Sequence, residues 1–237
     1  MKAIILAAGM GTRLRPLTNT TPKCLVPIGG TPLLELWLRK CEHAGLDGVL
    51  INTHHLSHCV EEFVASRRGI SVTLTHEREL LGSAGTIAAN WDFAGSDDSF
   101  LAIYADNLTT FCLSELLHFH ARHDQIASVA LFRSPTPKAC GVVEMNDSGL
   151  ITGFWEKPDN PPGNLCNAGL YAFRRQIRPY LPTEFPSDVG RSLLPALVGH
   201  ARGLEIDDYF VDIGTLENYQ RAQADYAAAC RGVEAAC

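Results

Sequence analysis

Short apolar runs alternate with amphipathic segments from the start of the chain to Arg133. Lys2–Leu6 is a continuous apolar run, the pattern of a strand that is covered on both faces. Pro32–Ala44 carries apolar residues at helical spacing, and Gly45 would end that helix. Further strands are predicted over Gly48–Asn52, Ile70–Thr75, Ser99–Ala105 and Ala127–Arg133, and further helices over Leu56–Ser66, Ala84–Asn90 and Ser114–His123.

After Arg133, glycine-, proline- and asparagine-rich turns separate the apolar runs, which is typical of antiparallel strands. Strands are predicted there over Val142–Met145, Ile151–Trp155, Cys166–Phe173 and Tyr209–Asp212, and a closing helix over Leu216–Ala229. Repeated strand–helix units build a mostly parallel sheet. We therefore predict an α/β fold, in which a mixed, mostly parallel, Rossmann-like sheet is flanked by helices and carries a small antiparallel insertion.

The overall charge limits the classes of partner. The chain of 237 residues has a formal net charge of −6, which argues against broad binding to nucleic acid or to an anionic membrane. No apolar run approaches the roughly 20 residues that a membrane span needs, and the N-terminus shows no signal-peptide pattern. We expect a cytoplasmic protein whose cationic sites are local.

The segment AAGMGTRLRP, from Ala7 to Pro16, places glycines and arginines directly after the first strand. Glycines let backbone N–H groups approach an anion, and arginine is well suited to phosphate oxygens. The P-loop pattern is absent, and the dinucleotide fingerprint fails because Leu14 stands at its third glycine. Its acidic residue is also missing at the end of the second strand, which reads Asn52-Thr53.

A third phosphate-binding pattern fits this loop. LAAGMGTRLRPLT followed by TPK resembles the L-A-G-G-x-G-T-R-L-x-P-L-T…P-K motif of the sugar-1-phosphate nucleotidylyltransferases, which make an NDP-sugar and pyrophosphate. The resemblance implies that Arg13 and Lys23 are catalytic. It also implies that the nucleotide is held by Leu6, Ala7, Ala8, Gly9, Gly11, Thr12, Arg13 and Asp106.

The stretch Leu81–Thr86, which reads LGSAGT, resembles the base-recognition segment of this family. Its form is similar to that of the guanylyltransferase branch, and the implied contacts come from Gly82, Ser83, Gly85 and Thr86. A second interpretation is a helix start with Ser83 as its N-cap.

Two aspartates are candidates for a metal site. Asp106 ends a strand in YADN, and Asp212 lies in VDIGT, which resembles the D-x-G-T motif of the family. Mg²⁺ prefers one or two carboxylates together with phosphate oxygens, so the resemblance implies that both bind Mg²⁺. Either aspartate alone could instead be a helix cap at the end of a strand. Ala105 stands where the family has glycine.

The same resemblance assigns the sugar phosphate to Asn107 and to motifs in the second half of the chain. The segments KACGVVE, WEKP and NAGLY resemble the Y-G-V-V, E-K-P and N-x-G-x-Y motifs, although Cys140 replaces the aromatic residue of the first. The implied sugar-phosphate contacts are Asn107, Gly141, Glu156, Lys157, Asn167 and Gly169.

These resemblances cover nearly the whole chain and imply a single nucleotidyltransferase domain over 1–237, similar to GT-A folds. Residues 1–133 would form its nucleotide-binding portion, 134–213 its sugar-binding portion and 214–237 its C-terminal helix. The expected reaction joins GTP to a manno-configured heptose or mannose 1-phosphate for nucleotide-sugar and polysaccharide biosynthesis. A uridylyltransferase acting on an amino-sugar or muramic acid 1-phosphate is the alternative. A metal-dependent glycosyltransferase and a non-catalytic nucleotide-binding module are more distant, and a homodimer is an open alternative to a monomer.

Overall fold

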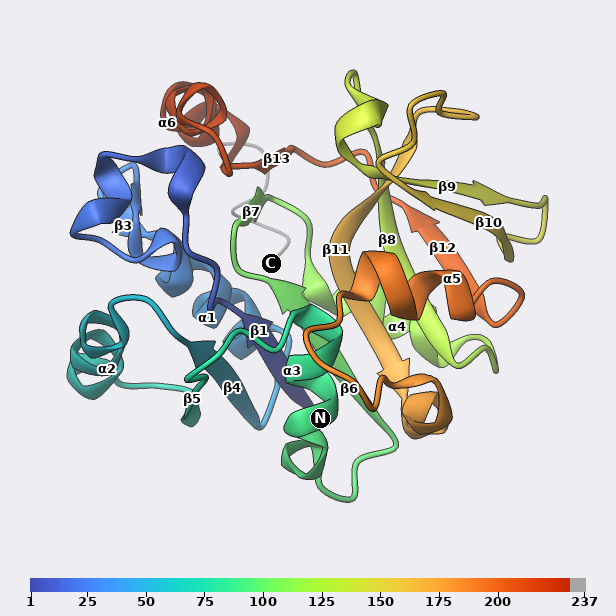
Figure 1. Cartoon of the computed structure of the whole chain (residues 1–237), viewed down its shortest axis with the longest axis horizontal. Helices are drawn as coiled ribbons and strands as arrows, with labels where there is room; N and C mark the ends of the chain where they lie inside the picture. The colour runs from blue at the N-terminus through green and yellow to red at the C-terminus, as the bar shows by residue number, and fades with distance from the viewer. Residues whose placement is uncertain (231–237) are drawn as a thin grey trace. The chain divides into compact units, whose positions relative to one another are not determined.

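A computed structural model of the chain describes residues 1–230, which gather into two compact units. Unit 1 comprises Met1–Leu80, Ile103–Ser114 and the chain from Asp208 onward, and unit 2 comprises Leu81–Ala102 and Glu115–Asp207 (Figure 1). Each unit thus combines stretches that are far apart in the sequence. The division of one domain at residues 133 and 213 stays a prediction, and the last seven residues of its expected C-terminal helix lie outside the described residues.

Three parallel strands form the sheet of unit 1: β1 (Lys2–Leu6), β4 (Gly48–Thr53) and β5 (Val72–His76). β4 lies between β1 and β5, and the end of β6 (Ser99–Tyr104) follows beside β1. All six residues of β4 are buried, so a continuous apolar run rather than an alternating one encodes this strand. The carboxyl ends of β1, β4 and β5 meet at one edge of the sheet.

Two small antiparallel pairs complete the strands of unit 1. β2 (Pro27–Ile28) pairs with β3 (Thr31–Pro32), and β7 (Asn107–Thr109) pairs with β13 (Phe210–Asp212). The second pair joins segments about one hundred residues apart in the sequence, and it brings the strand end after Tyr104 next to the chain before α6.

The helices of unit 1 are α1 (Leu33–His43), α2 (Ser57–Ser66) and α6 (Leu216–Cys230). Apolar residues of α1 recur at helical spacing and are buried, and the indole of Trp37 donates to the Asn107 carbonyl at 2.9 Å. The helix ends before Gly45, whose φ of 69° is the left-handed conformation that glycine adopts after a helix.

Unit 2 contains a mixed sheet of β8 (Ala127–Arg133), β9 (Gly141–Met145), β10 (Ile151–Glu156), β11 (Leu165–Arg174) and β12 (Ala201–Glu205). β11 pairs antiparallel with β8 and β9, β10 pairs antiparallel with β9, and β12 pairs parallel with β8. β12 was not predicted, because its sequence ARGLE shows neither apolar alternation nor a continuous apolar run.

Unit 2 also contains α3 (Ser83–Ala89), all but the first two residues of α4 (Leu113–Ala121), the short α5 (Leu194–Ala196) and a π-helical turn over Val189–Leu193. Phe100 is a core residue here, with Trp91 and Phe173 as aromatic neighbours at ring-centroid distances of 5.9 and 5.7 Å. Short 3-10 helices cover Thr12–Leu14, Leu17–Asn19, Lys23–Leu25, Trp91–Ala94, Pro137–Ala139 and Arg175–Tyr180.

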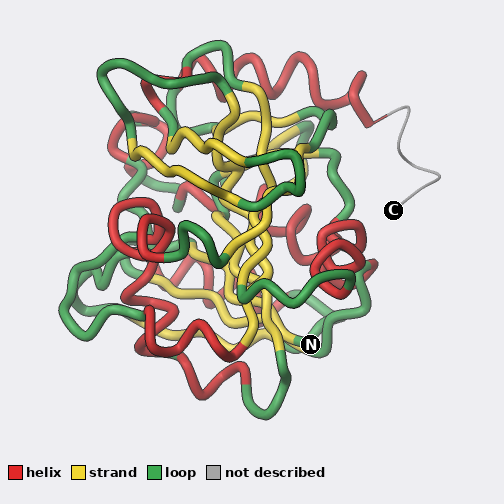
Figure 2. The backbone as a smooth tube through the Cα atoms, turned by 90° about the vertical axis from the view of Figure 1, so that its right-hand side faces the viewer, coloured by secondary structure: helices red, strands yellow, loops and turns green. Residues whose placement is uncertain are grey.

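The predicted α/β fold is confirmed: strands and helices alternate along the chain, and a mixed, mostly parallel sheet is flanked by helices and accompanied by small antiparallel pieces (Figure 2). The predicted ranges agree with the observed elements to within one or two residues at most ends. Among residues 1–230, no helix is both long and apolar enough to cross a membrane.

Candidate active site

The opening loop of unit 1 leaves β1 and turns sharply at Gly11, whose φ of 61° lies in the left-handed region. The Gly11 carbonyl accepts hydrogen bonds from Leu14 N at 2.9 Å and from the Thr18 hydroxyl at 2.7 Å. A Cβ at position 11 would lie 2.9 Å from the Thr18 methyl group, so any larger residue would push the turn open.

Four successive backbone N–H groups of this loop, those of residues 9–12, have no hydrogen-bond acceptor within residues 1–230. Successive N–H groups in a turn that contains a left-handed residue form a concavity that suits an anion. The geometry therefore agrees with the predicted role of Gly9, Gly11 and Thr12 as phosphate contacts.

The first three predicted loop contacts are already engaged inside the protein. The Leu6 carbonyl accepts from Ala105 N at 3.1 Å. The N–H groups of Ala7 and Ala8 donate to Asn52 Oδ1 at 2.6 and 3.3 Å. A contact of these N–H groups with a nucleotide would have to share or replace the Asn52 bond, which sets them apart from the four N–H groups that follow.

Lys23 joins the two predicted metal ligands in unit 1. Its ammonium lies 2.5 Å from Asp106 Oδ2 and 3.8 Å from Asp212 Oδ1, and the lysine side chain is only 10% exposed. The β7–β13 pair brings the aspartates together: Asp212 pairs with Asn107, and Ile213 N donates to the Asp106 carbonyl at 3.0 Å. Asn107 itself is a buried strand residue.

Arg13 reaches the same cluster. A Cβ on Gly214 would lie 2.9 Å from an Arg13 guanidinium nitrogen and 2.8 Å from Asp212 Oδ1, so the glycine allows the two groups to approach. Burial raises the pKa of Asp212, and the nearby Asp106 charge raises it further. Lys23, the Gly214 N–H and Arg13 act in the opposite direction without cancelling this effect.

The aspartate pair fits a hard divalent cation. Two carboxylates converge on one lysine, and after burial the Asp106 charge is the second cause of the raised pKa of Asp212. A dication at this position would reduce the repulsion between the two carboxylates. Within the described chain, no third histidine, cysteine or acidic residue joins the pair, so phosphate oxygens would have to complete its coordination.

The predicted base-recognition segment lies in unit 2 at the start of α3. Gly82, with a φ of 73°, is its N-cap, and α3 begins at Ser83. The second interpretation is thus right that a helix starts here, but the N-cap is Gly82 and not Ser83. The Ser187 carbonyl accepts from the N–H groups of Ala84 and Gly85 at 2.9 and 3.0 Å, so the segment around Ser187 completes the helix start.

Ser83 and Thr86 also have internal partners. The Ser83 hydroxyl accepts from Val189 N at 2.8 Å, and Ser83 lies 3.4 Å from the Asp188 carboxylate. The Thr86 hydroxyl donates to the Gly82 carbonyl at 3.1 Å. The segment Ser187–Val189, which the sequence did not point to, is thus the support of the predicted base-recognition residues.

Five of the six predicted sugar residues lie in unit 2, where Gly141, Glu156, Asn167 and Gly169 belong to strands and Lys157 follows β10. Asn107 lies apart from them, in β7 of unit 1. Glu156 pairs with Gly141 across β10 and β9, and a Cβ on Gly141 would lie 2.9 Å from Glu156 Oε2. A Cβ on Gly190 would lie 2.5 Å from the same oxygen, so two glycines leave room around this carboxylate.

Lys157 follows with a φ of 50°, and its N–H donates to the Cys140 carbonyl at 3.0 Å. Within residues 1–230, only Leu56 shares this left-handed conformation among non-glycine residues. A strained residue of this kind persists when its surroundings hold it, and such residues cluster at functional sites.

Asn167 and Gly169 lie at a register shift in β11. Gly169 has a φ of 68°, and its N–H donates to Asn167 Oδ1 at 2.9 Å, while the Asn167 amide donates to the Tyr171 hydroxyl at 2.6 Å. The bulge therefore fixes the Asn167 side chain, and glycine permits the bulge.

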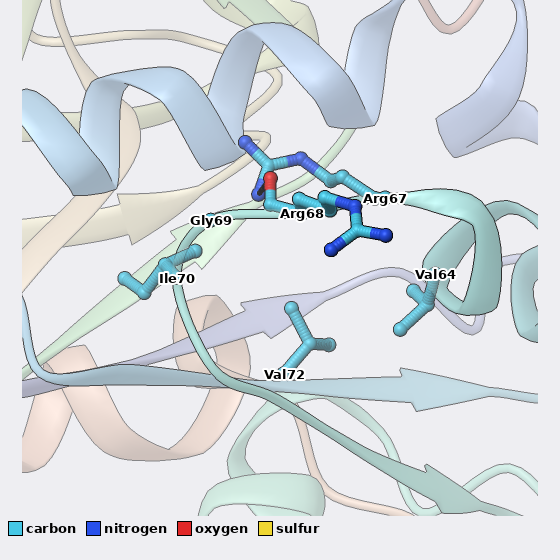
Figure 3. Close-up of a pocket in the computed structure, with 6 residues that line it drawn as sticks. All are labelled: Val64, Arg67, Arg68, Gly69, Ile70 and Val72. Atoms are coloured by element: carbon cyan, nitrogen blue, oxygen red, sulfur yellow. Dashed lines mark hydrogen bonds between the residues drawn. The ribbon is translucent and has the colours of Figure 1, made fainter.

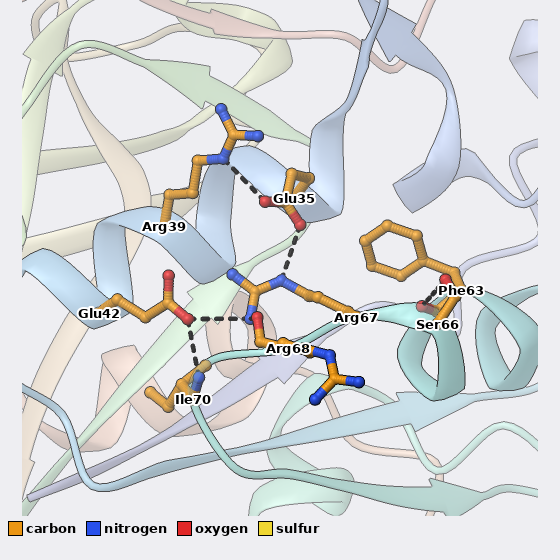
Figure 4. A network of polar contacts seen from close by, with 8 residues as sticks. All are labelled: Glu35, Arg39, Glu42, Phe63, Ser66, Arg67, Arg68 and Ile70. Carbon is orange, nitrogen blue, oxygen red and sulfur yellow. Dashed lines mark hydrogen bonds and ion pairs between the residues drawn. The ribbon is translucent and has the colours of Figure 1, made fainter.

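A separate cavity of about 390 Å³ lies in unit 1 between the end of α2 and β5, and its lining contains none of the predicted site residues (Figure 3). Arg67 and Arg68 line it, but their guanidinium groups point in different directions. Arg67 is bound by Glu35 at 2.7 Å and by Glu42 at 2.9 Å (Figure 4). This cavity is a feature of the fold rather than part of the candidate site.

Comparison with known proteins identifies relatives along nearly the whole chain. A UTP–glucose-1-phosphate uridylyltransferase of Synechocystis sp. is 32% identical over 94% of this chain and 62% of its own length. Mannose-1-phosphate guanylyltransferase of Mycobacterium tuberculosis is 32% identical over 94% and 64%, and the catalytic subunit beta of the Xenopus tropicalis enzyme is 30% identical over 98% and 66%. The chain thus spans slightly less than two thirds of the length of these relatives.

Solved structures share the fold. A Bacillus anthracis protein named as a glucose-1-phosphate thymidylyltransferase, solved with sucrose, has a TM-score of 0.82 and 26% identity over 94% of both chains. HddC from Yersinia pseudotuberculosis has the same fold, with a TM-score of 0.78 and 21% identity over 95% of this chain and 99% of its own. The model of the nucleotidyl transferase family matches residues 2–229. The chain therefore belongs to the nucleotidyl transferase family.

Proposed function

We propose that the protein transfers a nucleoside monophosphate from an NTP to a sugar 1-phosphate and releases pyrophosphate. The observation that carries this proposal is the cluster of Arg13, Lys23, Asp106 and Asp212 in the same unit as a loop with four unpaired N–H groups. The uridylyltransferase and guanylyltransferase relatives support the same reaction class.

The reaction needs charge control rather than acid–base catalysis. An oxygen of the sugar phosphate attacks the α-phosphorus of the NTP, and the bond from that phosphorus to the β-phosphate oxygen breaks. The attacking phosphate is already ionised near neutral pH, because its second pKa is about 6. At about 4 Å and an effective dielectric constant near 20, each pair of like unit charges costs roughly 4 kcal/mol, so the site must supply cations.

The cationic side chains have distinct roles in this proposal. Arg13 stabilises the leaving β- and γ-phosphates together with the charge that develops on the α-phosphoryl group. Lys23, held by Asp106, steadies the α-phosphate, and Lys157 binds the attacking phosphate. Asp106 and Asp212 would hold Mg²⁺, which when bound supplies Lewis-acid charge neutralisation of phosphate oxygens.

We further propose GTP and a manno-configured heptose or mannose 1-phosphate as substrates. The LGSAG segment, whose form resembles the guanylyltransferase branch, and the two guanylyltransferase relatives support this choice. UTP with an amino-sugar or muramic acid 1-phosphate is the second candidate. The uridylyltransferase relative favours its nucleotide.

One matrix of assays tests the proposal. ATP, CTP, GTP, UTP and dTTP are each mixed with mannose, heptose, glucose, glucosamine and muramic acid 1-phosphates, and pyrophosphate release is measured with Mg²⁺ and with EDTA. We expect the highest kcat/KM for GTP with a manno-configured sugar and loss of turnover in EDTA. Turnover with UTP alone would instead establish the uridylyltransferase.

The same matrix separates the distant alternatives. Nucleotide binding without pyrophosphate release for any pair would favour a non-catalytic module. Sugar transfer from an NDP-sugar, with NDP and not pyrophosphate as product, would favour a glycosyltransferase. Light scattering of the purified chain tests the expected monomer or homodimer.

A further inference from the structure

A buried hydrogen-bonded pair ties together the carboxyl ends of three parallel strands in unit 1. Asn52 ends the apolar part of β4 and is 4% exposed, and Glu77 follows β5 and is 5% exposed. Asn52 Nδ2 donates to Glu77 Oε1 at 2.8 Å, while Asn52 Oδ1 accepts from the N–H groups of Ala7 and Ala8 after β1.

The chemistry of these groups fixes the orientation of the Asn52 amide. Two backbone N–H donors require its oxygen, and a carboxylate acceptor requires its nitrogen, so a rotated amide would lose all three bonds. Glu77 is itself held by the backbone, because its N–H donates to the Thr53 carbonyl at 2.8 Å and its carbonyl lies 2.8 Å from His54 Nδ1. Glu77 thus supports Asn52, and Asn52 supports the loop.

This contact divides the opening loop into two parts. The N–H groups of Ala7 and Ala8 point inward to Asn52, whereas those of residues 9–12 have no acceptor in the described chain. Because the chain direction after β1 is set at Ala8, the Asn52 oxygen determines where the unpaired N–H groups of the anion-binding turn lie.

We propose that Asn52 is a positioning residue that holds the phosphate-binding loop ready for its ligand, and that Glu77 orients its amide. The proposal rests on the proposed function only in that the ligand is a nucleoside triphosphate. Inorganic tripolyphosphate has the same chain of three phosphates as a nucleoside triphosphate. It is therefore a probe of the loop whose binding can be measured without turnover.

The decisive experiment exchanges the amide of Asn52 and the carboxylate of Glu77. Asn52→Asp keeps the acceptor for Ala7 and Ala8 but sets a carboxylate against Glu77. The double variant Asn52→Asp/Glu77→Gln restores a donor–acceptor pair with the same total charge as the natural pair. Tripolyphosphate affinity is measured by calorimetry for the wild type, Asn52→Asp, the double variant and Asn52→Leu, which removes the acceptor. Circular dichroism checks that each variant is folded at the assay temperature.

We expect Asn52→Asp and Asn52→Leu to bind tripolyphosphate about tenfold more weakly, as loss of a buried hydrogen-bond partner predicts, and the double variant to recover most of that loss. Thr53→Val is the matched control, because Thr53 is a buried neighbour in β4 whose hydroxyl lies 3.4 Å from the Thr75 carbonyl. It should bind as the wild type does. In the turnover assay, Asn52→Leu should raise KM for the NTP and leave KM for the sugar phosphate unchanged.

The outcomes distinguish this proposal from the proposed function. Normal tripolyphosphate binding by folded Asn52→Leu would overturn the positioning role, and so would a double variant no better than Asn52→Asp. If Asn52→Leu does not fold, the comparison of Asn52→Asp with the double variant decides. Wild-type protein that binds tripolyphosphate and releases no pyrophosphate with any substrate pair would contradict the enzymatic function while leaving the loop assignment intact. Wild-type protein that does not bind the probe would overturn the loop assignment.

Discussion

Two clusters of unit 1 each combine two basic side chains with two carboxylates, yet they differ in how well the charges are paired. In the first, which we call the Arg67 cluster, Arg67 and Arg39 bind Glu35, and Arg67 also binds Glu42, at N–O distances of 2.7–2.9 Å. In the second, the Lys23 cluster, Lys23 lies 2.5 Å from one aspartate and 3.8 Å from the other. Arg13 forms no ion pair within 4.0 Å in the described chain.

The pKa shifts follow this difference. The hydrogen bond from Arg67 lowers the pKa of Glu42 most, and the Ile70 N–H adds to that effect. In the Lys23 cluster, burial and the neighbouring Asp106 raise the pKa of Asp212. Equal numbers of charges therefore lower the pKa of a carboxyl group in one cluster and raise it in the other. Carboxyl groups with a raised pKa are frequent at functional sites, which supports the Lys23 cluster as the candidate site.

The largest expected effect is a loss of stability when the ion pairs of the Arg67 cluster are broken. Arg67 is 9% exposed and holds two carboxylates, so Arg67→Ala should lower the free energy of unfolding by about 3 kcal/mol or more. Urea denaturation measures the change. Arg68→Ala, on the exposed neighbour, should stay within about 0.5 kcal/mol. A loss below about 1 kcal/mol for Arg67→Ala would mean that this network is not a main support of the fold.

The next effect is on catalysis. Arg13→Ala should lower kcat by about 10²–10³, the scale of one lost preorganised donor, while the free energy of unfolding changes by less than about 0.5 kcal/mol. Steady-state pyrophosphate release with the best substrate pair gives kcat. Arg15→Ala is the matched control, since Arg15 is an exposed arginine two residues away, and its kcat should stay near the wild-type value. Normal turnover by Arg13→Ala would remove Arg13 from the proposed mechanism.

A substitution at Asp212 should lower activity without lowering stability, whereas a substitution at Arg67 should lower stability. The Asp212 side chain is 48% exposed and its pKa is raised, so Asp212→Asn should not lower the free energy of unfolding by more than about 0.5 kcal/mol. Pyrophosphate release should fall by at least about tenfold, and the Mg²⁺ concentration for half-maximal activity should rise. Glu42→Gln serves as the control with the reverse pattern, with lower stability and normal turnover. A strongly destabilised Asp212→Asn protein would show that this aspartate is structural.

The sequence predicted much of this arrangement because local signals mark strand ends and helical faces. β8 was predicted with both of its bounds. Arg13, Lys23, Asp106 and Asp212, which were predicted to act in one site, lie close together in unit 1, where the β7–β13 pair joins the two aspartates. Those predictions depended on motifs whose residue types match the chemistry that we propose for them.

Contacts between distant segments were not predictable in the same way. From the sequence, Asn52 served only as evidence against a dinucleotide-binding site. Its hydrogen-bond partners Glu77 and Ala7 are distant in the sequence and come close only when the strands pair. The Ser187 support of α3 was missed since a loop carbonyl has no side-chain signature. A polar residue at the end of an apolar strand was the one available signal for Asn52.

The smallest expected effect is on how the free energy of unfolding changes with pH in acid. A carboxyl whose pKa is lower in the folded than in the unfolded state stabilises the protein above the unfolded value, near 4.3 for glutamate. That contribution is lost as the pH falls from there through the folded pKa. Glu42 is such a group, so Glu42→Gln should unfold less steeply with acid below about pH 4.3 than the wild type does. Urea midpoints at pH 3–7 measure this slope.

Because Arg67 causes the shift, Arg67→Ala should flatten the slope as Glu42→Gln does, and combining both changes should add little more. An additive effect of the two substitutions would show that Arg67 contributes to the acid sensitivity through a group other than Glu42.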